Sequence, residues 1–166
     1  RLVLQAQPNH LGALQVLGAI TAQTRRPQEA YDLFAKVASA NPSDAMVHNN
    51  LGNVLKDLRR HPEALESYAR AIALKPDYFE AFVNRGNALG DMRRFAEAVE
   101  SYDRALALKP GFAEVHACRG LALHELGRLA DAVGSYERAI ALKPDFAEAH
   151  VNLGNALRGL ARAGEA

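Results

Sequence analysis

Apolar and small residues recur along the chain at spacings that predict short amphipathic helices. Leu51 and Leu55 are four residues apart, and Ala64 and Tyr68 repeat that spacing. Apolar positions three and four residues apart place their side chains on one face of a helix. Between the two stripes the polar residues 59–61 break the pattern, and a proline follows them at a point that suits the first turn of a new helix. The pattern predicts pairs of helices joined by tight turns.

These predicted helix pairs recur every 34 residues. Ala-Leu-Lys-Pro occurs at 73–76, 107–110 and 141–144, and glycines keep the same spacing at Gly18, Gly52, Gly86, Gly120 and Gly154. With each glycine at position 8, the repeats are 11–44, 45–78, 79–112 and 113–146, preceded by the tail of an earlier repeat at 1–10 and followed by a partial repeat at 147–166. Because a solenoid needs a polar capping helix and none follows, we expect this single repeat domain, 1–166, to be an excerpt of a longer protein.

Small and aromatic residues also keep the register. Position 20 is alanine in every repeat, and position 24 carries Phe34, Tyr68, Tyr102 and Tyr136. Two helices that cross closely need small residues where their backbones approach, so we expect the aromatic ring of position 24 to lie beside the glycine of position 8. No single repeat can bury its apolar faces alone, and neighbouring repeats must stack to do so.

The repeated residues resemble the tetratricopeptide repeat. In the second repeat, the matching residues are Leu51-Gly52, Ala64, Tyr68, Ala71 and Pro76. The resemblance implies an all-α fold, an α-solenoid of antiparallel helix pairs wound into a right-handed superhelix. It also implies that the first helix of each pair lines a concave groove.

Composition and charge narrow the classes of function. With 20 Lys and Arg against 19 Asp and Glu, the net charge of +1 lacks the basic excess typical of nucleic-acid binding. No apolar stretch approaches the roughly 20 residues of a membrane helix. The single cysteine, Cys118, excludes an internal disulfide and a multi-cysteine metal site, and fits a reducing cytoplasmic setting. Since no phosphate loop, serine nucleophile or paired catalytic carboxylates occur, we expect a binding module without cofactor or enzymatic activity.

Asparagine side chains are the leading candidates for a binding site. Position 6 carries Asn50, Asn84 and Asn152, and position 9 carries Asn53, Asn87 and Asn155. The two positions are one helical turn apart and are expected to face the groove, where amides can donate to and accept from the backbone of an extended peptide. Local hydrogen bonding within the repeat is the alternative. We expect additional apolar contacts from Val83, Ala117 and Val151, while Cys118 and Leu121 interrupt the two asparagine rows in the fourth repeat.

The sequence of residues 141–157 resembles repeats found ahead of the catalytic domain in bacterial O-linked N-acetylglucosamine transferase-type proteins. In that family an asparagine ladder holds the substrate polypeptide. The resemblance implies the same role for Asn50, Asn84 and Asn152, and it implies a parent glycosyltransferase whose repeats present protein substrates. A clamp for C-terminal carboxylates would need Lys or Arg at groove positions such as 5 and 9. Position 5 carries instead Gln15, Asn49, Val83, Ala117 and Val151.

Two further registers have structural interpretations. Position 4 carries His48, His116 and His150, but equivalent positions on helices ~8–10 Å apart rarely meet at one metal ion, so packing is favoured. Arg-Arg pairs recur between the two helices of a repeat, where acidic neighbours are expected to neutralise much of the charge.

The alternative to peptide binding is a self-associating assembly scaffold with no transferase link. Its contacts would be made by leucines on the last predicted helix, namely Leu153, Leu157 and Leu160.

Overall fold

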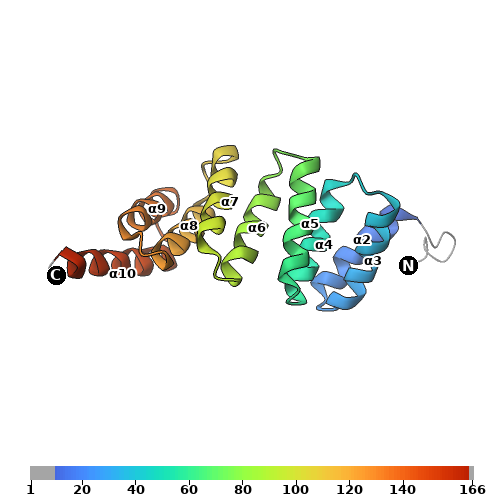
Figure 1. Ribbon diagram of the computed structural model, residues 1–166, viewed down its shortest axis with the longest axis horizontal. Helices are drawn as coiled ribbons and strands as arrows, with labels where there is room; N and C mark the ends of the chain where they lie inside the picture. The colour runs from blue at the N-terminus through green and yellow to red at the C-terminus, as the bar shows by residue number, and fades with distance from the viewer. Residues whose placement is uncertain (1–9, 165–166) are drawn as a thin grey trace. The chain divides into compact units, whose positions relative to one another are not determined.

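A computed structural model describes residues 10–164, which form nine α-helices and no strand (Figure 1). The helices are α2 (Leu11–Gln23), α3 (Pro27–Ala40), α4 (Ala45–Asp57), α5 (His61–Leu74), α6 (Phe79–Asp91), α7 (Phe95–Leu108), α8 (Ala113–Glu125), α9 (Leu129–Leu142) and α10 (Ala147–Gly164). The predicted all-α fold of paired helices is confirmed. Apart from His10, the predicted tail at 1–10 lies outside the described residues. Among those residues, no helix is long and apolar enough to span a bilayer.

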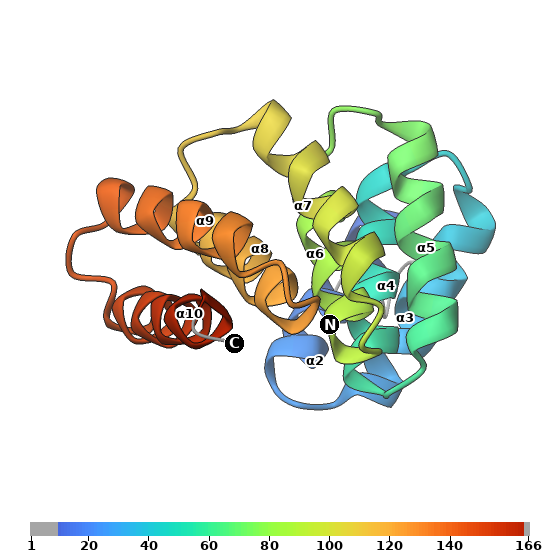
Figure 2. The ribbon, with the colours of Figure 1, turned by 60° about the vertical axis from the view of Figure 1, so that its left-hand side comes forward.

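The chain divides into two compact units between Asn84 and Arg85, within α6. In the first unit, α2 packs against α3, α3 against α4, and α4 against α5. In the second unit, α7 packs against α8, α8 against α9, and α9 against α10, and Figure 2 shows these last three helices together. The first helices of successive pairs also contact each other, α2 with α4 and α8 with α10. Each unit therefore has a surface formed by neighbouring first helices.

The predicted close crossing of the two helices in a repeat is confirmed. A Cβ atom added to Gly52 would lie 2.5 Å from Cε1 of Tyr68, and one added to Gly86 would lie 2.5 Å from Cε1 of Tyr102. Real Cβ atoms do not approach a carbon so closely, so only glycine fits beneath these rings. A Cβ atom added to Gly120 would likewise lie 2.6 Å from the Tyr136 ring, and one added to Gly18 would lie 3.0 Å from the Phe34 ring.

The turn between the two helices of a repeat needs one residue with a left-handed backbone. Arg59 and Arg93 have φ of 62° and 59°, and Gly127 takes the same place with φ of 73°. The following arginine forms an ion pair three residues along the chain, as between Arg94 and Glu97 at 2.6 Å. The pairs Arg26–Glu29, Arg60–Glu63 and Arg128–Asp131 repeat this contact. Acidic neighbours thus pair with the arginine that follows the left-handed residue of each turn, and Arg93 also pairs with Glu125 at 3.4 Å. Much of the charge is neutralised, as expected from the sequence.

The position-4 histidines form hydrogen bonds with the backbone of the loop that precedes their own helix. Nε2 of His48 lies 3.0 Å from the carbonyl oxygen of Pro42, and Nε2 of His116 lies 3.0 Å from that of Pro110. His150 and Pro144 repeat the contact at 2.8 Å. Since a carbonyl oxygen can only accept, Nε2 carries the donated proton. Within the described residues, no group of three or more His, Cys, Asp or Glu side chains could hold a metal ion.

Candidate functional site

The asparagines of the first unit differ in how far their amides are engaged. Asn50 is half-buried on α4, and its amide makes no hydrogen bond with another described residue. Oδ1 of Asn53 accepts a hydrogen bond of 2.8 Å from the Tyr68 hydroxyl. Nδ2 of Asn84, on α6, donates to Oδ1 of Asn49 at 3.0 Å. Asn50 therefore keeps all of its hydrogen-bonding capacity, while Asn53 and Asn84 keep part of theirs.

Asn49 is a member of this set that the asparagine rows did not include. It is buried on α4, and its partner Asn84 lies 35 residues further along the chain. That separation joins position 5 of one repeat to position 6 of the next. Amides stand at both of these positions for Asn49 with Asn84 and for Gln15 with Asn50, but Gln15 donates to Asp44 instead. The sequence pattern therefore could not single out the bond between Asn49 and Asn84.

The second unit repeats this division of roles. Oδ1 of Asn87, on α6, accepts a hydrogen bond of 2.8 Å from the Tyr102 hydroxyl. Asn152, on α10, is half-buried and has no hydrogen-bond partner among the described residues. Asn155 is exposed and accepts a hydrogen bond from Arg158. Asn53 and Asn87 at position 9 thus bond the tyrosine of their own repeats, whereas Asn155 bonds Arg158. Asn50 and Asn152 at position 6 stay unengaged.

The three apolar candidates do not share one environment. Val151 on α10 has 63% of its surface exposed, and Val83 on α6 is half-buried. Ala117 on α8 has 7% exposed and packs with Ala139 and Ala149. Because its methyl group lies in the core of the second unit, Ala117 does not offer the exposed apolar contact expected of it.

The fourth repeat changes the chemistry of this surface. Leu121 takes position 9 and has 45% of its surface exposed. The Tyr136 side chain is 1% exposed, and its hydroxyl has no hydrogen-bond partner in the described part of the chain. Burial, together with the nearby negative charge of Glu148, raises the pKa of Tyr136 to about 12. Burial also raises the pKa of the Cys118 thiol, which opposes thiolate formation and agrees with an inert side chain.

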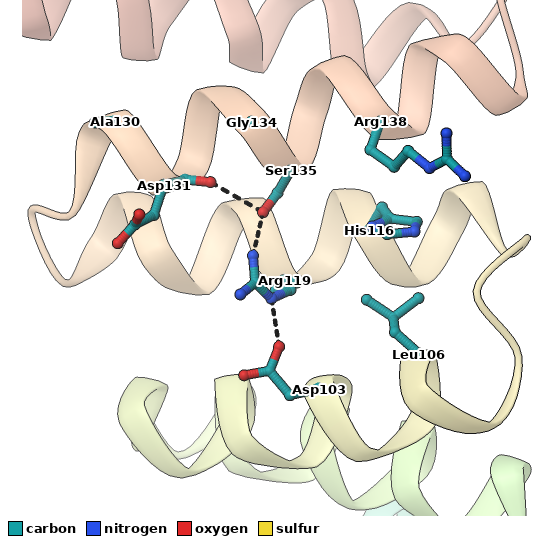
Figure 3. Close-up of a pocket in the computed structure, with 9 residues that line it drawn as sticks. All are labelled: Asp103, Leu106, His116, Arg119, Ala130, Asp131, Gly134, Ser135 and Arg138. Atoms are coloured by element: carbon teal, nitrogen blue, oxygen red, sulfur yellow. Dashed lines mark hydrogen bonds and ion pairs between the residues drawn. The ribbon is translucent and has the colours of Figure 1, made fainter.

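A separate pocket of about 430 Å³ lies in the second unit and is lined from α7, α8 and α9 (Figure 3). At its centre, Nε of Arg119 donates to Oδ1 of Asp103 at 2.6 Å, and the Nη1 group of Arg119 donates to Oγ of Ser135 at 2.6 Å. Oγ of Ser135 in turn donates to the carbonyl oxygen of Asp131 at 3.0 Å. The rows of repeated residues gave no signal for this pocket, because His116, Ser135 and Arg138 recur in other repeats, whereas Asp103 and Gly134 do not.

Comparison with known families settles the class of the repeat. A family described as tetratricopeptide repeat matches residues 45–78 and 79–112, and one described as TPR repeat matches residues 120–159. Together these matches cover more than half of the chain. The chain belongs to the tetratricopeptide repeat family. No curated protein sequence matches it.

Solved structures of other tetratricopeptide repeat (TPR) proteins share the fold. MamA is 27% identical, with 88% of this chain and 85% of MamA aligned at a TM-score of 0.82. The first TPR of Spaghetti (RPAP3), bound to HSP90 peptide SRMEEVD, is 28% identical over 70% of this chain and 93% of its own, at a TM-score of 0.68. YrrB, a TPR protein with an unusual peptide-binding site, is 24% identical over 88% and 75%, at a TM-score of 0.78.

Proposed function

We propose that this TPR chain is a non-enzymatic protein-interaction module whose first helices bind an extended polypeptide. The observation that carries the proposal is the free amide at position 6, on Asn50 in one unit and Asn152 in the other. Each amide offers two donors and an acceptor, the groups needed to pair with peptide N–H and C=O groups. The likeness to the RPAP3 domain, which is 28% identical and bound to a peptide, supports this reading.

The position-9 asparagines contribute in a second way. Because Oδ1 of Asn53 and of Asn87 is held by a tyrosine hydroxyl at 2.8 Å, the orientation of each amide is fixed. Its two N–H donors remain for the carbonyl oxygens of a ligand. An amide that is already oriented loses less conformational entropy on binding than a free one. The tyrosine contact and peptide binding are therefore compatible roles for the same side chain.

We propose recognition of a peptide backbone and not of a C-terminal carboxylate. A carboxylate clamp needs cations at position 5, and none of the five residues there is Lys or Arg. Asn49, which holds position 5 in the second repeat, is buried and hydrogen-bonded to Asn84. A ligand of this module would then be an internal, extended segment of a protein.

We further propose that the module presents protein substrates to a glycosyltransferase domain, as in bacterial, cytoplasmic O-GlcNAc transferase-type proteins. This proposal is supported by the sequence of residues 141–157 and by the amides of Asn50, Asn84 and Asn152. This finer proposal predicts acceptance of many sequences, because a transferase of this kind must hold diverse polypeptides by the backbone they share.

A diverse peptide array tests the proposal. The variant Asn50→Ala/Asn152→Ala removes the two unengaged amides, and Gln28→Ala/Ser39→Ala on α3 is the matched control at exposed polar positions. We expect broad binding by the parent and the control and its loss in the asparagine variant, with equal helical circular dichroism in all three. Equal binding by all three proteins would assign the asparagines to structure.

Self-association is the second candidate, favoured by apolar exposure on α10. Val151 and Leu157 are exposed there, whereas Leu153 and Leu160 are half-buried. Light scattering over a range of concentrations separates the two functions. A concentration-dependent mass that Leu157→Ser reduces would support assembly, and a strict monomer would contradict it.

A further inference from the structure

We propose that the pocket between α7, α8 and α9 binds an oxyanion, a carboxylate or a phosphate group, at Arg138, with the apolar part of the ligand against His116 and Leu106. None of these residues belongs to the peptide-binding proposal, so the two proposals stand or fall separately. The ligand class follows from the construction of the pocket, the pairing of its charges and the space at one position of α9.

The pocket is built from pairs of residues three apart on three helices. Asp103 and Leu106 come from α7, His116 and Arg119 from α8, and Ser135 and Arg138 from α9. Residues three apart lie on the same face of a helix, one turn from each other. Figure 3 shows Arg119 between Asp103 and Ser135, and the His116 ring between Arg138 and Leu106. One end is thus closed by hydrogen bonds, and the other is formed by a cation, a ring and an aliphatic side chain.

Charge pairing leaves one cation available. The carboxylate of Asp103 is bound by Arg119 at 2.6 Å, and that of Asp131 is bound by Arg128 at 2.6 Å. Arg138 has no ion-pair or hydrogen-bond partner among the described residues. A guanidinium presents five N–H donors in a planar fork that matches the geometry of carboxylate and phosphate. The unpaired charge lining this pocket is therefore suited to an anion.

Gly134 distinguishes the surroundings of Arg138 from those of its equivalents in other repeats. Its equivalents in the second and third repeats are Glu66 and Glu100, each four residues before an arginine. Glutamate and arginine at that spacing are neighbours on a helix surface and attract each other. Glycine removes the competing carboxylate beside Arg138, and a Cβ at Gly134 would meet nothing within 4 Å, so space stands open there. The fourth repeat therefore has open space, and no neighbouring carboxylate, at the position where the second and third repeats carry glutamate.

The histidines provide an internal comparison for the test. His48, His116 and His150 each contact a proline carbonyl through Nε2, at 3.0, 3.0 and 2.8 Å, but His116 alone of the three lines the pocket. We would titrate the full chain with inorganic phosphate and with propionate at constant pH. Sodium chloride at matched ionic strength is the reference, and the histidine ring resonances are followed by NMR. We expect a saturable shift of His116 in the millimolar range and no saturable shift of His48 or His150.

The two probes identify the chemistry of the ligand, and three variants locate its binding site. Saturation by phosphate alone assigns a phosphate ligand, by propionate alone a carboxylate ligand, and by both a general oxyanion site. We expect Arg138→Gln to weaken the response at least fivefold and Gly134→Glu to weaken it as well. Arg70→Gln, at the equivalent exposed position of the second repeat, should leave it unchanged. Because Arg138 is exposed and without a partner in the described structure, its substitution should not disturb folding, which circular dichroism checks. Equal shifts at all three histidines, or an undiminished response in Arg138→Gln, would overturn the proposal.

Discussion

The repeats at 79–112 and 113–146 solve the same packing problem with different polar chemistry. In the first, Tyr102 closes on Gly86, and its hydroxyl donates to Asn87 at 2.8 Å. In the second, Tyr136 closes on Gly120 in the same way, but Leu121 replaces the asparagine. The ring contact is therefore independent of the hydroxyl contact. The glycine and the ring belong to folding, whereas position 9 is free to set the chemistry of the surface above them.

The largest expected effect comes from the contact that the two repeats share. Gly86→Ala places a Cβ 2.5 Å from the Tyr102 ring, and we expect it to lower the free energy of unfolding by about 2–3 kcal/mol. Gly90→Ala, on the same helix with nothing within 4 Å of its Cβ, is the matched control and should raise it by up to about 1 kcal/mol. Urea denaturation measures both. Equal and small effects would show that the ring does not depend on glycine.

Alkaline pH sharpens the comparison next. Burial raises the pKa of Tyr136 to about 12 and raises that of Tyr102 as well. Because the unfolded chain loses these protons near pH 10, the contribution of the two tyrosines to stability is constant below pH 10 and falls between pH 10 and about 12. We expect Tyr136→Phe to reduce this loss by up to about 2 kcal/mol, measured by urea denaturation at a series of pH values. A pH profile identical to that of the parent protein would mean that the Tyr136 pKa is ordinary.

Exchanging the position-9 residues tests the hydroxyl contact itself. Asn87→Leu removes the acceptor of the Tyr102 hydroxyl and should cost about 1 kcal/mol. Leu121→Asn supplies an acceptor to Tyr136 and should change stability in the opposite direction. A double-mutant cycle of Asn87→Leu with Tyr102→Phe should give a coupling of about 1 kcal/mol. A coupling near zero would remove the structural role assigned to Asn87.

The smallest effect is expected at the turns, where the two repeats agree. Arg94 pairs with Glu97 at 2.6 Å, and Arg128 pairs with Asp131 at 2.6 Å, both exposed to solvent. Exposed ion pairs contribute little to stability because solvent and salt screen them. Glu97→Gln and Asp131→Asn should each leave the urea midpoint unchanged within error. A clear shift in either variant would show that the turn contributes to the difference between the repeats.

The fold was predictable because its signals are local and repeated. Glycine at position 8 and an aromatic residue at position 24 indicate the close crossing from the sequence alone. The burial of Ala117 was not predictable in the same way, since it depends on how α9 and α10 pack over α8. The same holds for the bond between Asn49 and Asn84, which requires the register of two neighbouring first helices.

The candidate site was predictable in composition and not in detail. The asparagine rows gave the positions, but the engagement of Asn53 and Asn87 depends on a tyrosine hydroxyl 15 residues away. The contact of Arg119 with Ser135 in this pocket is repeated by Arg85 with Ser101, but Asp103 and Gly134 depart from the residues at the same positions of other repeats. A residue that departs from the repeat pattern can be assigned to a site only when the packing shows which other residues lie beside it.

Unengaged amides of the first helices, Asn50 and Asn152, are proposed to bind a peptide backbone. The most direct test is calorimetric: an array-selected peptide is compared with copies that carry single N-methyl groups and with copies that carry single side-chain substitutions. We predict that at least one N-methyl group weakens binding about tenfold or more and that most side-chain substitutions have little effect. In the Asn50→Ala/Asn152→Ala variant, N-methylation should cause a smaller loss of affinity. Binding that tolerates every N-methyl group and is lost on changing one side chain would contradict the claim.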